Sequence, residues 1–330
     1  MVAQEEIPAR SGPIAVEPGR PQRVGAVIVT YFPRPDSLQA LLDAVASQVE
    51  RLVLVDNTPA AHAGPDLSRF ASERCDVIRN GDNLGLAAAQ NLGIGRARER
   101  GCDHVLLLDQ DSLPAPGMVD RLCSALRRLQ SSGVRVAAVG PRWNDRHSGR
   151  DAPFVRIGVG RMHKVHCDDR SREPVACDTL VASGCLIPVA SYDAIGPMDE
   201  RLFIDQVDVE WGLRAQALGY RLFGVCDAVL QHGIGEAAVP VWFARGRRVP
   251  VHSPVRDYYL VRNTITVFFR RPAPWRWRLL SAVRLPALLL VMLTQMPQRR
   301  RRLRYIARAI IDALRGRLGP LPVAATSARL

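Results

Sequence analysis

The sequence predicts an α/β fold with a mainly parallel central sheet, followed by a basic, partly amphipathic helical segment. Two observations support this prediction. Between residues 24 and 108, apolar runs rich in β-branched residues alternate with stretches of helical periodicity, the pattern of strands joined by crossover helices. The last quarter of the 330-residue chain combines an apolar stretch with most of the positive charge. A chain of this length can bury a large core, as one domain or as a domain with an appendage.

A strand and a helix are predicted first. Residues 24–31, VGAVIVTY, indicate a buried strand because their apolar side chains are continuous and mostly β-branched. Pro33 and Pro35 end this strand. In residues 37–48 apolar side chains recur every three or four positions, which predicts an amphipathic helix that Asp36 can cap.

Three more strands and one more helix follow. The pattern predicts strands at residues 51–55, 75–79 and 103–108, and a helix at residues 86–100 that ends at Gly101. In a parallel sheet, ligands bind beyond the carboxyl ends of the strands. Polar residues stand at three of these ends, namely Thr30 with Tyr31, Asp56 with Asn57, and Asp109 with Asp111. Their coincidence predicts a binding site at this edge of the sheet.

The carboxylates of Asp109 and Asp111 give the strongest chemical signal. They follow a buried-looking run of leucines and stand two residues apart, so both can face one cation. Oxygen ligands suit Mg²⁺ or Mn²⁺, which often bridge to a substrate diphosphate. The alternative is that both are solvated turn or cap residues.

A second acidic cluster lies further along the chain. Its residues are Asp205, Asp208 and Glu210, followed by Trp211 and Arg214. Glu210 and Arg214 stand four residues apart at the start of a predicted helix, so they can simply pair with each other. A charged helix entry is the structural alternative for the whole cluster.

Motif and composition patterns exclude some classes of protein. No GxGxxG follows the first strand, and no GxxxxGK[ST] occurs, which argues against a dinucleotide-binding domain and a P-loop. Residues 1–23 lack an apolar stretch and predict a disordered leader, not a signal peptide. Seven scattered cysteines without a CxxC pair indicate a reducing cytosol. His163, His166, Cys167 and Cys177 fit no standard zinc spacing.

The charge is concentrated at the C-terminal end. Residues 241–330 contain 19 Arg and two Asp, a net charge of +17, whereas residues 1–240 carry −4 of the total of +13. The same region holds the most apolar stretch, residues 279–296, whose charge-free part of 12 residues is shorter than the ~20 residues that span a bilayer. A basic cluster follows it, made of Arg299, Arg300, Arg301, Arg302, Arg304 and Arg308.

An apolar face followed by a basic cluster predicts a segment that lies in an anionic membrane surface. One alternative is a core helix followed by a solvated basic helix. Nucleic acid is another, because Trp275 and Trp277 alternate with arginines, but no nucleic-acid motif accompanies them. The expected division is therefore a leader at 1–23, an α/β domain at 24–240 and a membrane-associating region at 241–330.

Five segments together resemble the family 2 glycosyltransferases, in particular the bacterial rhamnosyltransferases that use a dTDP-sugar. They are VIVTYFPRP, LVDNT, GDNLGLAAAQNLGI, LLLDQDS and FIDQVDVEWGLRAQALGY. The resemblance covers residues 24–233 and, more faintly, YYLVRN at 258–263. It implies a GT-A fold, with one nucleotide-binding domain, and an inverting, metal-dependent transfer without a covalent sugar intermediate.

The resemblance also implies roles for residues at the donor end of the site. Thr30 and Tyr31 would line the base and ribose pocket, and Asn83 and Gly85 would face the nucleotide. Asp56 would accept a hydrogen bond from the pyrimidine N3–H, which uracil and thymine have and cytosine lacks. The alternatives are an Asx turn at Asp56 and a plain helix-entry turn at residues 83–85.

Metal and catalytic roles follow from the same resemblance. Asp109 would touch the ribose or the metal, Asp111 would bind Mn²⁺ or Mg²⁺ directly, and His232, at the end of the strand-like run VLQH, would complete the metal site. Asp208 would deprotonate the acceptor hydroxyl while the metal stabilises the departing diphosphate, and Asp205 is the second candidate for the base.

A sugar or acceptor pocket would include Glu210, Trp211 and Arg214. Gly184, which precedes the acidic cluster in the run SGC, is expected in the same pocket.

The expected function is the transfer of a sugar, L-rhamnose from dTDP-L-rhamnose, to a saccharide or lipid-linked saccharide acceptor in cell-surface polysaccharide synthesis. The enzyme would be cytoplasmic and peripheral on the inner face of the cell membrane, without a nucleic-acid partner. A UDP-sugar donor is the alternative within this fold. A phosphatase of the haloacid dehalogenase type is disfavoured, because its DxD sits on the first strand and Lys164 is the only candidate for its lysine. Nothing supports an inactive scaffold, because both acidic clusters are intact.

Overall fold

The computed structural model describes residues 22–62, 64–145, 151–168, 173–232, 238–242 and 248–322. Its α-helices are α1 (Pro35–Ala46), α2 (Leu86–Glu99), α3 (Met118–Ser131), α4 (Val189–Ile195), α5 (Val207–Ala217), α6 (Pro254–Phe269), α7 (Trp275–Thr294) and α8 (Arg299–Leu314). Its strands are β1 (Val24–Thr30), β2 (Arg51–Asp56), β3 (Cys75–Arg79), β4 (His104–Asp109), β5 (Ser112–Pro114), β6 (Val136–Asp145), β7 (Asp151–Ala152), β8 (Phe154–Ile157), β9 (Met162–Val165), β10 (Val175–Cys177), β11 (Leu186–Pro188), β12 (Arg221–His232), β13 (Ala238–Pro240) and β14 (Arg248–Pro250). Two 3₁₀ turns lie at Leu67–Phe70 and Glu200–Leu202. The predicted α/β fold is confirmed.

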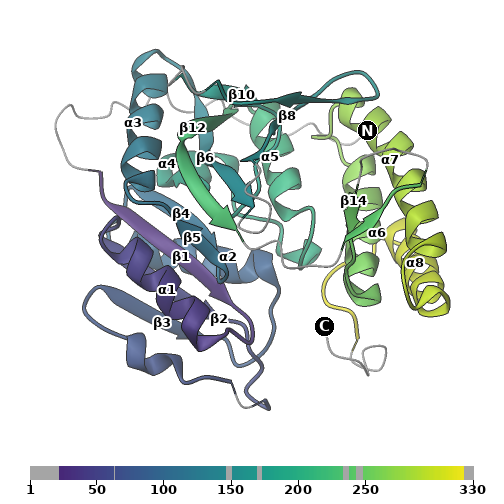
Figure 1. Cartoon of the computed structure of the whole chain (residues 1–330), viewed down its shortest axis with the longest axis horizontal. Coiled ribbons are helices and arrows are strands. Elements are labelled where there is room, and N and C mark those ends of the chain that lie inside the picture. The colour runs from purple at the N-terminus through teal and green to yellow at the C-terminus, as the bar shows by residue number, and fades with distance from the viewer. Residues whose placement is uncertain are drawn as a thin grey trace, which may run out of the picture.

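A ten-stranded mixed sheet forms the centre of the molecule, in the order β10-β12-β6-β11-β4-β1-β2-β3 (Figure 1). Strands β4, β1, β2 and β3 run parallel, as do β6 and β12, whereas β11 is antiparallel to both of its neighbours. The short strand β5 pairs with β12, and β7 with β6. The parallel part contains the four strands that the sequence predicted.

The register of the parallel strands brings three polar ends together. Thr30 at the end of β1 is paired with Asp56 at the end of β2. On the other side of β1, Val29 is paired with Asp109 at the end of β4. The predicted convergence of these strand ends at one edge of the sheet is therefore confirmed.

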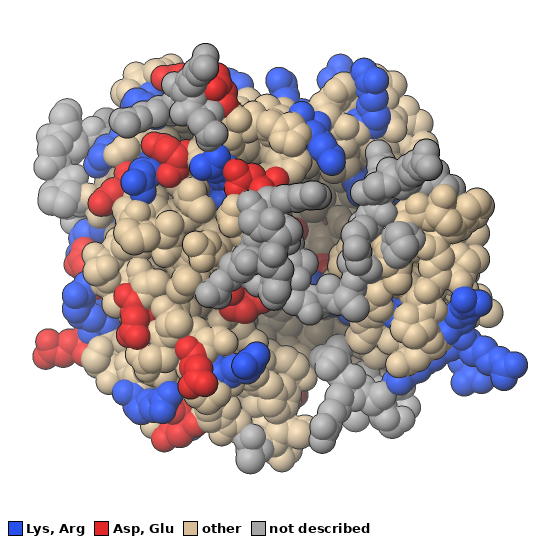
Figure 2. All heavy atoms as spheres, in the orientation of Figure 1, with Lys and Arg blue, Asp and Glu red and all other residues tan. Residues whose placement is uncertain are grey.

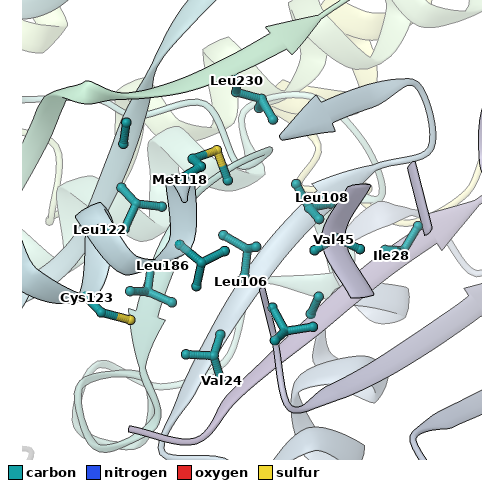
Figure 3. Packing of buried hydrophobic residues seen from close by; sticks show 14 of the residues in the cluster. Val24, Ile28, Val45, Leu106, Leu108, Met118, Leu122, Cys123, Leu186 and Leu230 are labelled. Atoms are coloured by element: carbon teal, nitrogen blue, oxygen red, sulfur yellow. The ribbon is translucent and has the colours of Figure 1, made fainter. Parts of the chain in front are cut away.

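Helices cover both faces of the sheet because successive residues of a buried strand point to opposite faces. On one face, Ile28 of β1 and Leu106 of β4 pack with Leu122 of α3, and α1 completes this layer (Figure 3). On the other face, Val27 of β1 and Leu107 of β4 pack against the layer of α2, α4 and α5. Burial on both sides explains why the strand sequences are apolar without alternation.

The start of α1 corrects one expectation. The prediction that Asp36 caps this helix is wrong, because α1 begins at Pro35 and is preceded by Arg34, without a side-chain cap. Proline suits the first helical position, since it has no N–H to satisfy and its φ angle is already helical. Asp36 lies instead in the first turn, where a negative charge interacts favourably with the helix dipole.

The three C-terminal helices form a separate layer beside the sheet (Figure 1). Helix α6 packs on α8 around a cluster that includes Val255, Tyr258, Ile306 and Ala309, and α7 adds Met292. By length and composition alone, one helix among the described residues, α7, is long and apolar enough to cross a membrane, and 22% of its apolar window is buried.

The cysteines also correct an expectation. Cys167 and Cys226 form a disulfide with a Cα–Cα distance of 5.5 Å, a pair that the interpretation of seven scattered cysteines did not include. The two cysteines are 59 residues apart in the sequence, so no local pattern predicts that they pair. They meet because the segment after β9 passes β12. The predicted leader at residues 1–23 lies, apart from its last two residues, outside the described residues.

Candidate active site

The ends of β1 and β2 form a buried polar pair. Thr30 donates its hydroxyl to Oδ1 of Asp56 at 3.2 Å, and the Thr58 backbone N–H donates to the same oxygen at 3.0 Å. The second contact is an Asx turn, so the structural alternative for Asp56 is present. Both hydrogen bonds from described residues use Oδ1, which leaves Oδ2 to accept a hydrogen bond from a ligand.

The turn before α2 is hydrogen-bonded to the end of β2, next to the pair of Thr30 and Asp56. Asn57 donates to the Gly85 carbonyl at 3.0 Å, and the Gly85 N–H donates to Oδ1 of Asn83, also at 3.0 Å. Burial raises the pKa of the Tyr31 phenol, and a hydrogen bond with the Asn83 side chain opposes that rise. The structure thus brings together the nucleotide-binding candidates Thr30, Tyr31, Asp56, Asn83 and Gly85.

Gln110, which the prediction did not include, and Ser183, which it placed only in the run before the acidic cluster, hold the turn after β4. The Gln110 amide pairs with the Tyr31 backbone, accepting from its N–H at 2.8 Å and donating to its carbonyl at 3.1 Å. Ser183, 1% exposed, accepts from the Asp109 N–H at 2.9 Å and bonds the Ser112 hydroxyl at 2.7 Å. These contacts fix the backbone on both sides of Asp109.

A metal ion would be held mainly by carboxylate oxygens at this turn. In the ladder between β5 and β12, Ser112 is paired with His232, so the backbone of His232 lies beside that of Asp111. The side chain of His232 lies outside the described residues. Among the side chains that are described, no three His, Cys, Asp or Glu gather closely enough to bind a metal by themselves. The donor set of Asp109 and Asp111 fits a hard divalent cation whose remaining ligands come from a diphosphate.

Asp205 and Asp208 lie at the start of α5 in two different environments. Asp208 accepts hydrogen bonds from the backbone of Val209, at 2.8 Å, and of Ala182, while burial raises its pKa. Burial also raises the pKa of Asp205, to about 6, against the opposing charge of Arg256, whose Nε lies 3.4 Å from Oδ1. The other oxygen of Asp205 is buried without a hydrogen-bond partner among the described residues. Both carboxyls are therefore more basic than an exposed aspartate.

The turn at residues 182–185 connects the two acidic motifs. Ala182 donates its N–H to Asp208, and the next residue, Ser183, accepts from the N–H of Asp109. Burial raises the pKa of the Cys185 thiol; the charge of Asp208 is the next cause, and Asp109 also contributes. One turn, at residues 182–185, therefore contacts both the predicted metal ligand Asp109 and the predicted base Asp208. The molecule's surface is hollowed between the sheet and the C-terminal helices (Figure 2).

The four residues expected in a sugar or acceptor pocket make contacts within the protein, and their place in that pocket stays a prediction. Glu210 pairs with Arg214 at 3.1 Å, as the helical spacing indicated, and Trp211, 3% exposed, donates to the Gly196 carbonyl at 2.9 Å. Gly184 has a φ of +87°, and a Cβ there would lie 2.5 Å from the Pro141 ring. These contacts give no support to a place in a pocket.

Comparison with known proteins gives a consistent picture. The sequence profile "Glycosyl transferase family 2" matches residues 26–176. The dTDP-rhamnosyl transferase RfbF of Shigella flexneri is 32% identical over 250 residues, which cover 76% of this chain and 81% of RfbF. The N-acetylglucosaminyl-diphospho-decaprenol L-rhamnosyltransferase of Mycobacterium tuberculosis is 26% identical over 85% of this chain and 96% of its own.

Two solved structures share the fold at low sequence identity. Residues 1–349 of S. aureus TarS superpose with a TM-score of 0.55 at 13% identity, covering 88% of this chain and 81% of that one. GalNAc-T7, solved with UDP, GalNAc and Mn²⁺, gives 0.55 at 16% identity over 74% of this chain, which spans about half (48%) of that one. At these identities the likeness shows the fold alone.

Proposed function

The chain belongs to glycosyltransferase family 2 and is an enzyme of nucleotide-sugar glycosyl transfer, and we propose that it moves L-rhamnose from dTDP-L-rhamnose to a lipid-linked saccharide in cell-surface polysaccharide synthesis. The single observation that carries the donor is the 32% identity to a dTDP-rhamnosyl transferase across 81% of that relative. The acceptor class rests on the second rhamnosyltransferase, whose name describes a sugar attached to diphospho-decaprenol.

In this proposal the strand ends of β1 and β2 bind the nucleotide. Oδ2 of Asp56 accepts the N3–H of thymine, while Thr30 keeps Oδ1 in place through its 3.2 Å hydrogen bond. Tyr31 and Asn83 close the side of the pocket. Because Asn57 holds the Gly85 carbonyl, the start of α2 stays close to these groups.

Asp208 is the base in this proposal. A carboxylate whose pKa is raised by burial removes a proton from a sugar hydroxyl more readily than an exposed one. The backbone N–H groups of Val209 and Ala182 hold its orientation. Asp205 is the second candidate, but Arg256 already faces its Oδ1.

Asp109 and Asp111 would hold Mn²⁺ or Mg²⁺ together with the donor diphosphate, with His232 as a further ligand. A bound cation of this kind neutralises the charge of the departing diphosphate. Ser183 and Gln110 then act through the backbone, because they keep the two carboxylates at the end of β4.

The C-terminal helices would hold the enzyme on the inner face of the cell membrane, whose surface is anionic. On α7, Trp275, Leu279, Val283 and Leu290 are 40–60% exposed, and their spacing of four, four and seven puts them on one side of the helix. On α8, three further exposed apolar side chains do the same: Leu303, Ile311 and Leu314. The net charge of +17 in residues 241–330 complements anionic lipid.

The basic cluster contributes to this surface without one of its members. Arg302 is 1% exposed, forms an ion pair with the buried Asp257 and donates to the Pro297 carbonyl at 2.8 Å. Its predicted place among the lipid-facing arginines is therefore wrong, because α8 turns it into the layer of C-terminal helices. Arg299, Arg300 and Arg304 remain exposed, and Figure 2 shows basic side chains at the upper end and at the lower right of the C-terminal helices.

Donor choice is tested by thermal unfolding of the purified protein with dTDP-, UDP- and GDP-sugars, each with Mn²⁺ and with EDTA. A ligand at a hundredfold excess over its Kd adds about 2.7 kcal/mol of apparent stability. We expect a Mn²⁺-dependent rise with dTDP-L-rhamnose above all others. A rise with UDP-sugars alone would overturn the donor assignment and leave the family unchanged.

Membrane attachment is tested by co-sedimentation with vesicles of phosphatidylglycerol and phosphatidylcholine. The double variant Leu279→Glu, Val283→Glu should bind at least about tenfold more weakly, because two apolar side chains no longer enter the interface. Leu218→Glu, an equally exposed leucine outside the C-terminal helices, is the matched control. Equal binding of all three proteins would contradict the proposed surface.

A further inference from the structure

The segment at residues 203–206, which leads into α5, has an unusual backbone. Phe203, Asp205 and Gln206 have φ angles of +68°, +62° and +62°. None of them is glycine, and such conformations persist only where the surroundings determine them strongly. The same segment carries Asp205 and sets the position of Asp208 in the first turn of α5.

One buried amide on the C-terminal helix α6 holds this backbone. Nδ2 of Asn263, which is 0% exposed, lies 2.8 Å from the Leu202 carbonyl, 2.8 Å from that of Ile204 and 2.9 Å from that of Asp205. Nε of Arg262 donates to Oδ1 of Asn263 at 2.9 Å, which fixes which way the amide faces. An amide in this position contacts three carbonyls within four residues.

Arg262 supports the same segment from the side. It is 1% exposed, and its Nη2 donates to the Leu202 carbonyl at 3.0 Å while Nη1 donates to the Gly319 carbonyl at 2.6 Å. Its guanidinium also lies over the rings of Tyr258 and Tyr259. Arg262 therefore ties several parts of the C-terminal layer together, whereas the amide of Asn263 is directed at the acidic segment alone.

The held segment also contacts the nucleotide side of the site. The Phe203 carbonyl accepts from the N–H of Leu86, the first residue of α2, at 2.6 Å. This approach is possible because the preceding residue is Gly85, where a Cβ would lie 2.7 Å from the same carbonyl oxygen. One short backbone segment thus lies between α6, the start of α2 and the two candidate bases.

We propose that Asn263 is a positioning residue for the transfer step, which it serves by holding the backbone at residues 202–205 so that the carboxylate at the start of α5 faces the donor sugar. This inference rests on the proposed function. Asn263 touches no reacting atom; it acts through the segment that carries Asp205 and precedes Asp208. The donor pocket is built mainly from β1, β2 and β4, and Asn57 of the β2 end also holds the turn before α2 through its 3.0 Å hydrogen bond to the Gly85 carbonyl, so binding of the nucleotide should depend little on the Asn263 amide.

The test separates turnover from binding and from folding. The variants are Asn263→Ala, which removes the amide, and Asn263→Ser, which keeps one short donor. Thr264→Val is the matched control, since Thr264 is buried next to Asn263 and, within the part of the chain that the structure describes, its hydroxyl bonds only the Leu260 carbonyl of its own helix, at 2.7 Å. Functional sites are counted by calorimetric binding of dTDP with Mn²⁺. The rate is the single-turnover release of dTDP from dTDP-L-rhamnose, with water or an added membrane lipid extract as acceptor.

We expect turnover per functional site to fall about 10- to 100-fold in Asn263→Ala, because displacing a reacting group by about 1 Å has an effect of this size. The Kd for dTDP should change less than about threefold, Asn263→Ser should be intermediate, and Thr264→Val should match the wild type. A purely structural role would lower the number of functional sites and leave the rate per site unchanged.

Several outcomes would overturn the inference. Wild-type turnover per site in Asn263→Ala would do so, as would loss of dTDP binding in a variant that remains folded. If Asn263→Ala does not fold, Asn263→Ser decides, and full activity per site in that variant refutes the positioning role. A wild-type enzyme that binds dTDP but turns over no dTDP-L-rhamnose would contradict the proposed function itself, and the inference with it.

Discussion

Replacing Asp205 with asparagine should stabilise the protein at neutral and alkaline pH. Burial raises the pKa of this carboxyl to about 6 in the folded protein, and the charge of Arg256 only partly opposes it. An unfolded aspartate titrates near 3.9. Between these values the folded state binds the proton more strongly than the unfolded state, so the contribution of Asp205 to stability falls as pH rises through about 4 to 6 and is level above that range.

The size of the effect follows from the two pKa values. A difference of about two units, at 1.36 kcal/mol per unit, makes the ionised carboxylate of Asp205 cost about 3 kcal/mol above pH 7, as an upper value. Asparagine has nearly the same shape and no charge. Asp205→Asn should therefore be more stable than the wild type by about 2–3 kcal/mol at pH 8, and the difference should vanish below about pH 4.

Urea unfolding of both proteins at pH 5, 6, 7 and 8 measures this difference. The buried His104, whose pKa burial lowers to about 4, is present in both proteins and cancels in the comparison. The charge of Asp257, whose own pKa burial raises to about 6, contributes to the raised pKa of Asp205 and is therefore part of the measured difference. Asp120→Asn, an exposed aspartate on α3, controls for the change in net charge. A variant of Asp205 with wild-type stability at pH 8, or with a difference that does not change with pH, would refute the assignment of a costly buried charge.

Three further substitutions test the site. Asp111→Ala should abolish the Mn²⁺-dependent thermal stabilisation by dTDP while the protein stays folded, because the residue is exposed; calorimetry in Mn²⁺ and in EDTA checks this. Asp208→Asn should leave the Kd for dTDP within about twofold and lower turnover by about 10²- to 10⁴-fold, the usual effect of losing a general base; retained turnover would move that role to Asp205. Gly85→Ala should lose about 2–4 kcal/mol in urea unfolding, from its φ of +88° together with the contact 2.6 Å from the Phe203 ring. Gly133→Ala, with a φ of +77° in open space, should lose only the conformational part, and equal losses would contradict the steric contribution.

The parallel part of the sheet was predictable because local pattern and topology agree there. Continuous β-branched runs identify strands that are buried on both faces, and parallel pairing then aligns their carboxyl ends without any further information. This is why Thr30, Asp56 and Asp109, separated by up to 79 positions, could be placed at one edge from sequence. The pairing of Thr30 with Asp56 and of Val29 with Asp109 bears this out.

The residues that hold the site in place could not be predicted in the same way. Ser183, Gln110 and Asn263 act through hydrogen bonds to backbone groups 58 to 79 residues away, and such contacts leave no periodic trace in the sequence. A serine or a glutamine beside an acidic motif is ordinary at a turn. A hint for Asn263 lay in the segment YYLVRN, which the family resemblance included faintly, but its target became visible only in three dimensions.

A run of arginines poses a related difficulty. From the sequence, Arg299 to Arg302 are equivalent members of one basic cluster. The helical phase of α8 turns Arg302 toward Asp257, while Arg299 and Arg300 remain exposed and Arg301 is half-buried. Which arginine is buried depends on the position of Asp257, 45 residues away on α6, and the local sequence pattern cannot predict this partner.

The C-terminal helices contribute to the active site as well as to the proposed membrane surface, and this decides how that surface must be tested. The first turn of α6 places Arg256 beside Asp205 and Asp257 beside Arg302 of α8, while Asn263, two turns later, holds the acidic segment. Deleting residues 279–330 would remove Arg302 and leave the buried Asp257 without its counter-charge, which is strongly destabilising. Such a truncation would lose activity whether or not the helices bind lipid. Substitutions on the exposed side of α7 leave these contacts intact, so release from vesicles with unchanged turnover in solution would separate attachment from catalysis.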